Sequence, residues 1–213
     1  MVETDETFKT CAVVGNSGIV LKEKHGEFID SHDFVIRFNL APTEGYESHV
    51  GTKTSLRIVN CHMFHSLIFP ESCKANEETF SEFDPQYALK LKNERILIKN
   101  NVDPMVFGSV FELMKQNGCT VEMLDARVIQ EVSEELNLKT GIEPSNGMIG
   151  TFLAKNLFDK VSCFGFSFYS DPWESKHYYE DMTPYDQSVV HNFTEEREWL
   201  ENLDQTKEVR IYK

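Results

Sequence analysis

The chain has 213 residues, of which 40% are hydrophobic and 26% charged, and this is an ordinary globular composition. A chain of this length can bury a full core and fits one domain more easily than two, so residues 1–213 are predicted to form a single domain. The formal net charge of −14 argues against general nucleic-acid binding, because phosphate contacts need clustered Lys and Arg. A local pocket can still hold a small phosphate-bearing ligand against that overall field.

No membrane span, secretory signal or metal-binding cysteine pattern is predicted. The sequence contains no run of about 18 apolar residues, and its N-terminus, MVETDETFKT, is acidic and polar, unlike a secretory signal peptide. The five cysteines are irregularly spaced without a CxxC pair, which predicts neither a disulfide framework nor a zinc site. They are Cys11, Cys61, Cys73, Cys119 and Cys163.

Strand-like and helix-like stretches alternate along the chain, which indicates an α/β fold. Short apolar runs predict strands at residues 11–15, 34–38, 55–59, 95–99, 120–124 and 161–166, and residues 208–212 alternate like an edge strand. Helices are predicted over 103–117, 127–138, 144–159 and 192–203 from helical spacing and capping residues. Residues 61–87 are predicted to be an irregular loop with at most one helix, of the kind that often covers a site.

Two strand-to-helix turns are candidates for phosphate binding. Gly15-Asn16-Ser17-Gly18 follows the first strand, and Ser145-Asn146-Gly147 opens an apolar helix. A helix N-terminus offers unpaired backbone N–H groups and the positive end of the helix dipole, and small residues let a ligand approach the backbone. Each turn taken alone is explained as well by a helix cap and a tight turn. No Asp-x-Asp pair occurs, which disfavours a nucleotide sugar held through a divalent metal.

Four segments in order resemble the motifs of the eukaryotic sialyltransferases, glycosyltransferase family 29. The stretches CAVVGNSG, IDSHDFVIRFNLAPTEGY and VGTKTSLRIVN, within residues 11–60, resemble the large sialyl motif. PSNGMIGTFLAKNLFDKVSCFGF, residues 144–166, is similar to the small motif, and HYYE, residues 177–180, to the third. His191 and Glu196, a His-x-x-x-x-Glu pair, resemble the very short motif. The resemblance spans nearly the whole chain.

The resemblance implies a variant GT-A, Rossmann-like fold with a mostly parallel central sheet flanked by helices. It also implies CMP-sialic acid as donor, a glycan acceptor, inversion at the anomeric carbon, and no metal or other cofactor. Carried over by motif position, Asn16 and Ser17 sit beside the donor and Asn39 contacts the nucleotide. Ser145, Asn146 and Gly147 hold the CMP phosphate and ribose, His177 faces the phosphate and His191 is the general base.

The chemistry of transfer fits the two histidines. Transfer needs a deprotonated acceptor and a stabilised leaving phosphate, and an imidazole of near-neutral pKa suits a base. The position of His191 just before a helix start is expected to lower its pKa and keep the ring neutral. His177, as an imidazolium, would neutralise charge on the departing CMP. Glu196 is expected either to orient a histidine or pair with a basic neighbour, or to be a solvated helix residue.

Two departures from the family pattern bear on the cellular compartment. In the family the cysteine of the large motif pairs with one in the small motif; Cys11 keeps the first position, but Phe158 occupies the second, and Cys163 lies five residues on. The chain also starts almost at the large motif, without the anchor and stem of Golgi enzymes. Together these features suggest a protein of the cytoplasm or another reducing compartment. The Golgi lumen is the alternative if the chain is a piece of a longer protein.

Three functions remain open on the sequence. The first is an active sialyltransferase. The second is transfer of another CMP-activated acidic sugar such as Kdo, because the motifs indicate CMP and a carboxylated sugar rather than the whole of sialic acid. The third is a CMP-sugar-binding protein without catalysis, which the retained His177 and His191 disfavour. The acceptor, the linkage and the oligomeric state do not follow from the sequence.

Overall fold

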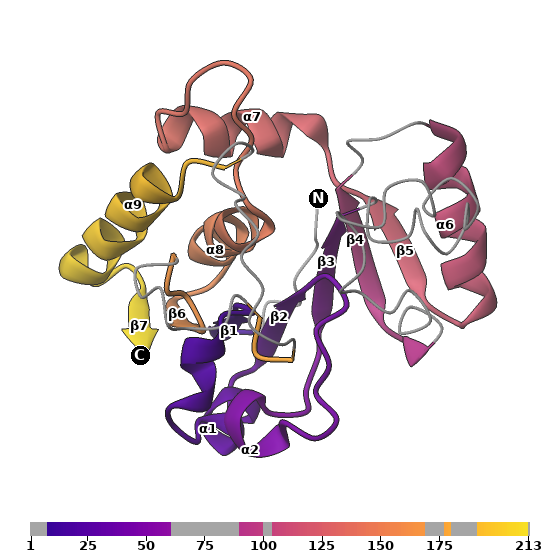
Figure 1. Cartoon of the computed structure of the whole chain (residues 1–213), viewed down its shortest axis with the longest axis horizontal. Helices are drawn as coiled ribbons and strands as arrows, with labels where there is room; N and C mark the ends of the chain where they lie inside the picture. The colour runs from indigo at the N-terminus through magenta and orange to yellow at the C-terminus, as the bar shows by residue number, and fades with distance from the viewer. Residues whose placement is uncertain (1–7, 61–89, 100–103, 169–176, 180–190, 213) are drawn as a thin grey trace.

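The computed structural model describes residues 8–60, 90–99, 104–168, 177–179 and 191–212. Within them, seven strands form one sheet in the order β5-β4-β3-β2-β1-β6-β7, and every neighbouring pair is parallel (Figure 1). The predicted α/β fold with a largely parallel sheet is confirmed. The strands are β1 (Thr10–Val14), β2 (Phe34–Phe38), β3 (Leu56–Asn60), β4 (Arg95–Lys99), β5 (Thr120–Met123), β6 (Lys160–Phe164) and β7 (Arg210–Tyr212).

Helices connect most of the strands, as parallel pairing requires. The short elements at residues 18–50 were not predicted, because four or five residues are too few to show a helical period. In the part of the chain that the structure describes, no helix has both the length and the apolarity to cross a bilayer. The helices are η1 (Gly18–Leu21, a 3-10 turn), α1 (Gly26–Asp30), α2 (Glu47–Val50), α6 (Pro104–Gln116), α7 (Ala126–Glu135), α8 (Asn146–Leu157) and α9 (Phe193–Thr206).

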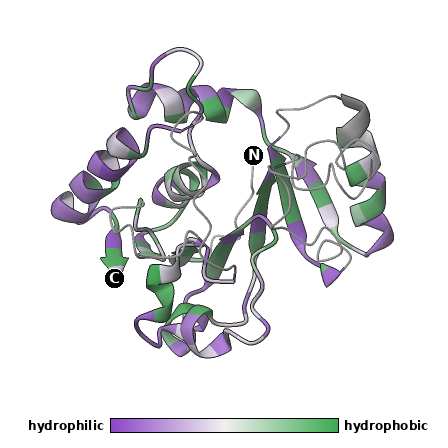
Figure 2. Cartoon of the chain, in the orientation of Figure 1, coloured by the Kyte–Doolittle hydropathy of each residue, from purple (hydrophilic) through white to green (hydrophobic). Residues whose placement is uncertain are grey.

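Both faces of the sheet are covered, which explains why the inner strands are continuous apolar runs. Alternate residues of one strand belong to different clusters: Cys11 and Val13 pack with α7, α8 and α9, whereas Ala12 and Val14 pack with η1, α1 and α2. In β3, Ile58 and Val59 divide in the same way between the α8 cluster and the α6 cluster. Figure 2 shows the inner strands as predominantly hydrophobic and the outlying α9 as mostly hydrophilic.

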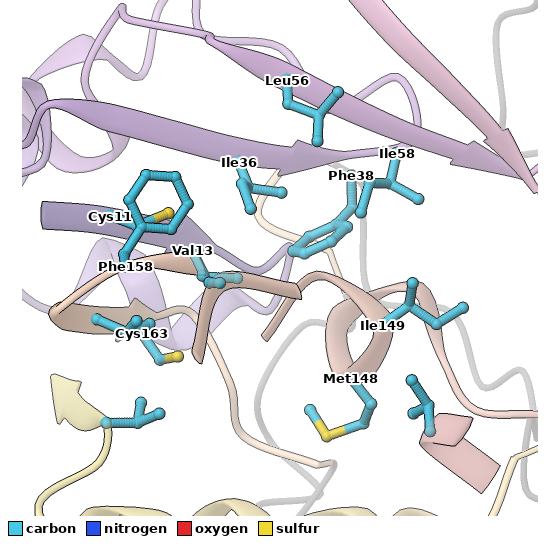
Figure 3. Close-up of a cluster of buried hydrophobic side chains, with 14 of the residues drawn as sticks. Cys11, Val13, Ile36, Phe38, Leu56, Ile58, Met148, Ile149, Phe158 and Cys163 are labelled. Atoms are coloured by element: carbon cyan, nitrogen blue, oxygen red, sulfur yellow. The ribbon is translucent and has the colours of Figure 1, made fainter. Parts of the chain in front are cut away.

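Helix α8 packs on the central strands β1, β2, β3 and β6, and Figure 3 shows its Met148 and Ile149 among the buried side chains of this core. Its residues Met148, Ile149 and Ala154 are fully buried. A Cβ at Gly150 would stand 2.6 Å from atoms of the Phe38 ring, so glycine is what lets the helix approach β2 this closely. The N-terminus of α8 is therefore held at a fixed position over the carboxyl ends of the central strands.

Phe158 ends α8 in the position where the family resemblance leads one to expect a cysteine. Its ring lies 5.2 Å from that of Phe34, and Figure 3 shows it beside Cys11 in the core. Cys11 and Cys163 are buried free thiols. Burial raises the pKa of Cys163 to about 12 and also raises that of Cys11, so both groups stay protonated and unreactive.

We predict that Cys11 and Cys163 remain unpaired in the purified protein. The physical reason is that an aromatic contact fills the space beside Cys11 and that both thiols lie inside the core. Alkylation of the denatured, non-reduced protein followed by peptide mapping should find both residues labelled. Recovery of a peptide in which Cys11 is disulfide-linked would contradict the prediction, and a reduced sample supplies the control for labelling efficiency.

Candidate active site

The candidate site lies at the carboxyl edge of the sheet, where the strand order reverses. Strands β2 to β5 follow one another away from β1 on one side, and β6 and β7 lie on the other. In open parallel sheets, ligands bind in the crevice outside the carboxyl ends at such a switch point. The turns after β1 and β6 meet there, and the predicted residues Asn16 and Ser17 lie in the first of them.

The backbones of the turns after β1 and β6 lie in direct contact. Gly15 N donates to Phe164 O at 2.7 Å, and Ser17 N donates to Gly165 O at 3.2 Å. A Cβ at Gly15 would stand 2.4 Å from Gly165 O, and one at Gly165, whose φ is +70°, would stand 2.5 Å from Gly15 O. The side chains of Ser17 and Ser167 then share a hydrogen bond of 2.7 Å. The Ser17 hydroxyl is thus engaged within the protein.

Asparagine side chains join the ends of β2 and β3 to α8. Asn39 has a φ of +48° and its Oδ1 accepts from Asn60 N at 3.0 Å and from Asn146 Nδ2 at 3.1 Å. Buried Arg57 fixes this left-handed residue by donating to Asn39 O at 2.9 Å. Asn39 and Asn146, both predicted to contact the CMP-sugar donor, are 107 positions apart in the chain and lie in direct contact. Asn60 is a further member that the sequence analysis did not identify.

Asn16 belongs to the same cluster and carries an unused acceptor. Its Nδ2 donates to Phe38 O at 3.4 Å, at the end of β2. Its Oδ1 is buried, and among the described residues it has no hydrogen-bond partner. A buried amide oxygen without a donor costs about 1–3 kcal/mol. A ligand that donates an O–H or N–H here would remove that cost, which makes Asn16 a suitable contact for a polar ligand.

The N-terminus of α8 is held by a buried carboxylate. Ser145 is the N-cap, and its N and Oγ donate to Glu196 Oε1 and Oε2 at 2.7 and 2.8 Å. Glu196 is 0% exposed, so its interpretation as a solvated residue was wrong. Burial raises its pKa to about 7, opposed by the two Ser145 hydrogen bonds and by Lys99. A Cβ at Gly147 would stand 2.8 Å from the Phe166 ring, so that turn also requires glycine.

His191 is anchored to the segment that leads into α8. Its Nδ1 lies 2.8 Å from Glu143 O, two residues before the Ser145 cap. Because a carbonyl oxygen only accepts, Nδ1 carries the hydrogen, and in the neutral ring Nε2 holds the lone pair. The pKa of His191 is lowered, as expected, but the first cause is burial, with Lys99 adding to it and the Glu143 hydrogen bond opposing it.

His177 reaches the site through its neighbours in the chain. Tyr178 N donates to Asn16 O at 2.9 Å, which ties the segment 177–179 to the turn after β1. Tyr178 is 5% exposed, and its hydroxyl donates to Pro42 O. The His177 ring stacks on Tyr179 with 5.3 Å between centroids. The fourth residue of the predicted motif, Glu180, lies outside the described residues.

The structure brings most of the predicted residues into one connected cluster. Backbone or side-chain contacts join Asn16 to β2, Asn39 to Asn146, and His191 to the segment before α8. Lys99 was not predicted as a site residue, yet it is 1% exposed and pairs with Glu143 Oε2 at 2.8 Å. The sequence feature that could have identified Lys99 is its position as a charged residue at the end of the apolar run RILIK. Among the described residues, no group of three or more His, Cys, Asp or Glu side chains could hold a metal ion.

The sequence profile of glycosyltransferase family 29 (sialyltransferase) matches residues 2–208. The chain belongs to this family of sialyltransferases. Chicken (Gallus gallus) CMP-N-acetylneuraminate-β-galactosamide-α-2,3-sialyltransferase 1 is 34% identical over 159 residues, which cover 74% of this chain and 44% of that protein. Its human counterpart is 28% identical over 210 residues, covering 96% and 58%. This sialyltransferase-family chain thus spans about half the length of the curated relatives it matches.

Solved sialyltransferases share the fold of this family member. A mammalian sialyltransferase superposes with a TM-score of 0.70 at 24% identity, covering 97% of this chain and 70% of that one. The monofunctional α-2,3-sialyltransferase Cst-I from Campylobacter jejuni gives a TM-score of 0.59 at 15% identity, covering 100% and 78%. At these identities the likeness establishes the fold, and it agrees with the predicted GT-A-like, Rossmann-like architecture.

The raised pKa of Glu196 predicts a pH-dependent stability. A carboxyl whose pKa rises on folding from 4.5 to about 7 keeps its proton in the folded state over an interval in which the unfolded state has lost it. Its contribution is therefore present at low pH and declines as the pH rises through that interval. Relative to Glu196→Gln, we expect the wild-type free energy of unfolding to fall by up to about 3 kcal/mol between these values.

Urea denaturation at a series of pH values measures this difference. Glu198→Gln is the matched control, because it makes the same substitution at an exposed position of the same helix. Its curve should run parallel to that of the wild type. Stability curves of wild type and Glu196→Gln that keep a constant separation across the interval would show that Glu196 does not titrate there.

Proposed function

We propose that the chain is an inverting, metal-independent glycosyltransferase that moves sialic acid from CMP-sialic acid to a hydroxyl of an acceptor glycan. The observation that carries this proposal is His191 held through Nδ1 at the segment leading into the N-terminus of α8. It puts a neutral imidazole, with its lone pair on Nε2, against the short segment that leads into a helix N-terminus suited to a phosphate.

The donor would bind at the switch point, outside the carboxyl ends of the strands. Backbone N–H groups at the start of α8, around Asn146 and Gly147, face a phosphate favourably because they carry the positive end of the helix dipole. Asn39 and Asn16 lie beside them, and Asn16 Oδ1, which has no partner among the described residues, is suited to a hydroxyl of the ribose or sugar or to the cytosine amino group. Ser145 serves this site as the N-cap, and Ser17 by fixing the first turn.

The reaction breaks the bond between the anomeric carbon and the phosphate oxygen and forms a bond to the acceptor oxygen on the opposite face. In our proposal Nε2 of His191 takes the acceptor hydroxyl proton as the new bond forms. His177 supplies an imidazolium beside the departing phosphate, where a positive charge stabilises the leaving group. The lowered pKa of His191 supports its role, since a base must be unprotonated at neutral pH.

The relatives favour sialic acid as the transferred sugar. The chicken and human proteins are named for CMP-N-acetylneuraminate as donor and for β-galactosamide as acceptor. Bovine (Bos taurus) β-galactoside α-2,6-sialyltransferase 2, 34% identical over 165 residues that cover 73% of this chain and 32% of that protein, is named for a different linkage. We therefore propose sialic acid ahead of Kdo and leave the linkage open. The buried free thiols support the proposal that the chain folds in a reducing compartment.

CMP is expected to bind without a divalent metal. The proposed site meets the phosphate with backbone N–H groups and an imidazolium, so chelation removes nothing that the nucleotide needs. Isothermal calorimetry of CMP in EDTA, and again with added Mg²⁺ or Mn²⁺, should give the same Kd. An affinity that disappears in EDTA and returns with metal would overturn the metal-independent mechanism.

His191→Ala and His177→Ala are expected to differ in their effects. Loss of the base should lower kcat by about 10²–10⁴-fold and leave the Kd for CMP nearly unchanged, since the base faces the acceptor. Loss of His177 should weaken CMP binding as well, because its charge faces the phosphate before and during the reaction. Transfer from CMP-sialic acid to a panel of glycans, followed by mass spectrometry, measures the rates.

His49→Ala is the matched control, because this half-buried histidine lies on α2 and has no part in the proposed mechanism. Near-wild-type kcat in His191→Ala with any accepted glycan would refute the base assignment. Equal loss of CMP affinity in the His191 and His177 variants would mean that their roles are exchanged or shared.

A further inference from the structure

Side chains from separate elements hold the three residues that precede α8. His191, ahead of α9, bonds to Glu143 O at 2.8 Å, and Glu196 of α9 accepts from Ser145 N at 2.7 Å. The remaining contacts come from Lys99 at the end of β4, whose Nζ donates to Pro144 O at 3.1 Å and pairs with Glu143 Oε2 at 2.8 Å. Every residue of this segment is thus fixed by a side chain distant in sequence.

Lys99 is an unusual residue for its position. It shares its sheet face with Leu97, which packs in the α8 cluster, and it is itself 1% exposed. Burying an ammonium costs several kcal/mol unless it is paired and hydrogen-bonded, and a Leu or Met would fill this place without that cost. The side-chain of its partner Glu143 is 43% exposed, so the ion pair reaches from the core to the edge of the site. A packing role alone does not explain a cation here.

Lys99 and the His191 ring both contact the same residue, Glu143. Lys99 binds the Glu143 carboxylate and the next carbonyl along the chain, Pro144 O. The carbonyl between these two groups, Glu143 O, is the acceptor for His191 Nδ1. A shift of this peptide would turn the imidazole and change which nitrogen carries the hydrogen in the neutral ring.

We propose that Lys99 is a positioning residue for His191, fixing through Glu143 and Pro144 the carbonyl that orients the imidazole and keeps its Nε2 available as the base. This inference rests on the proposed function, because only that function makes His191 a catalytic base. The orientation and protonation of the ring are properties of the folded protein, and they are measured without any substrate.

Among the described residues, two charged groups act on His191. They are the Lys99 ammonium from β4 and the Glu143 carboxylate from the segment before α8. Glu196 of α9 bonds to Ser145 in the same segment. The Glu143 carboxylate favours the imidazolium, whereas the Lys99 ammonium disfavours it. Removal of the Lys99 charge should therefore raise the pKa of His191, and removal of its two contacts should loosen the Nδ1–H tautomer.

Nitrogen NMR of ¹⁵N-histidine-labelled protein tests the inference directly. The ring shifts report both pKa and tautomer, and comparison with His191→Ala assigns the signal among the seven histidines. In Lys99→Met, and in Lys99→Gln, which keeps a donor for Pro144 O, the His191 pKa should move upward and the Nδ1–H tautomer should lose population. Lys99→Arg should stay close to wild type, because it retains the charge. The polar Gln variant keeps the test available if the Met variant does not fold.

Lys155→Met is the matched control. Lys155 of α8, whose side chain is 16% exposed, forms another Lys–Glu pair, with Glu135 of α7 at 2.6 Å. A structural effect of losing such a pair would alter stability in both variants, but only loss of Lys99 should move the His191 signal. An unchanged His191 pKa and tautomer in both Lys99→Met and Lys99→Gln would overturn the inference.

Activity supplies a second and separable readout. In Lys99→Met the acidic limb of the kcat–pH profile should move to higher pH, in the direction of the NMR shift, and kcat should fall by about tenfold, a part of what a base contributes. A shifted NMR titration with an unmoved kcat profile would overturn the link to the base. A wild-type protein that transfers no sialic acid would refute the proposed function, while the NMR titration would still decide whether Lys99 positions His191.

Discussion

The close approach of Gly15 to Gly165 is the constraint on which the site depends. At a switch point of a parallel sheet, two strands deliver their turns to the same place, and side chains would normally hold those turns apart. Here the backbones meet, and a Cβ on either glycine would stand 2.4–2.5 Å from the opposite carbonyl oxygen. The hydrogen bonds that this approach allows, from Gly15 N to Phe164 O and from Ser17 N to Gly165 O, fix the turn after β1 in which Asn16 and Ser17 lie.

A second constraint acts where the chain enters α8. The helix itself is seated by packing, with Gly150 against Phe38, so its N-terminus stands at a set height over the sheet. The residues just before it are held by hydrogen bonds and an ion pair instead of apolar contacts. This division has a physical reason: a site for a charged, polar ligand has to be lined by polar groups, and such groups keep their geometry only when each has a partner.

The fold was more predictable from the sequence than the site. Strands buried on both faces are continuous apolar runs, and strand β2, FVIRF, was placed with its full range. Glu196 shows why the site was harder. It stands in the acidic first turn of α9, which looks like a solvated face, and its burial depends on Ser145, 51 positions earlier. Lys99 likewise looks like the polar end of a strand until Glu143 and Pro144 are seen beside it. Periodicity carries information on neighbours in the chain and none on such distant contacts.

Lys99, at the entry to α8, affects the pKa of both Glu196 and His191. Glu196 has to be ionised to accept from both Ser145 N and Ser145 Oγ, and burial works against this by raising its pKa to about 7. In the proposed mechanism His191 has to be neutral to act as the base, and burial works in favour of this by lowering its pKa. The Lys99 ammonium lowers the pKa of both groups. A single buried cation therefore favours the carboxylate that holds the helix cap and the unprotonated imidazole beside it. An uncharged residue at position 99 would lose both effects at once.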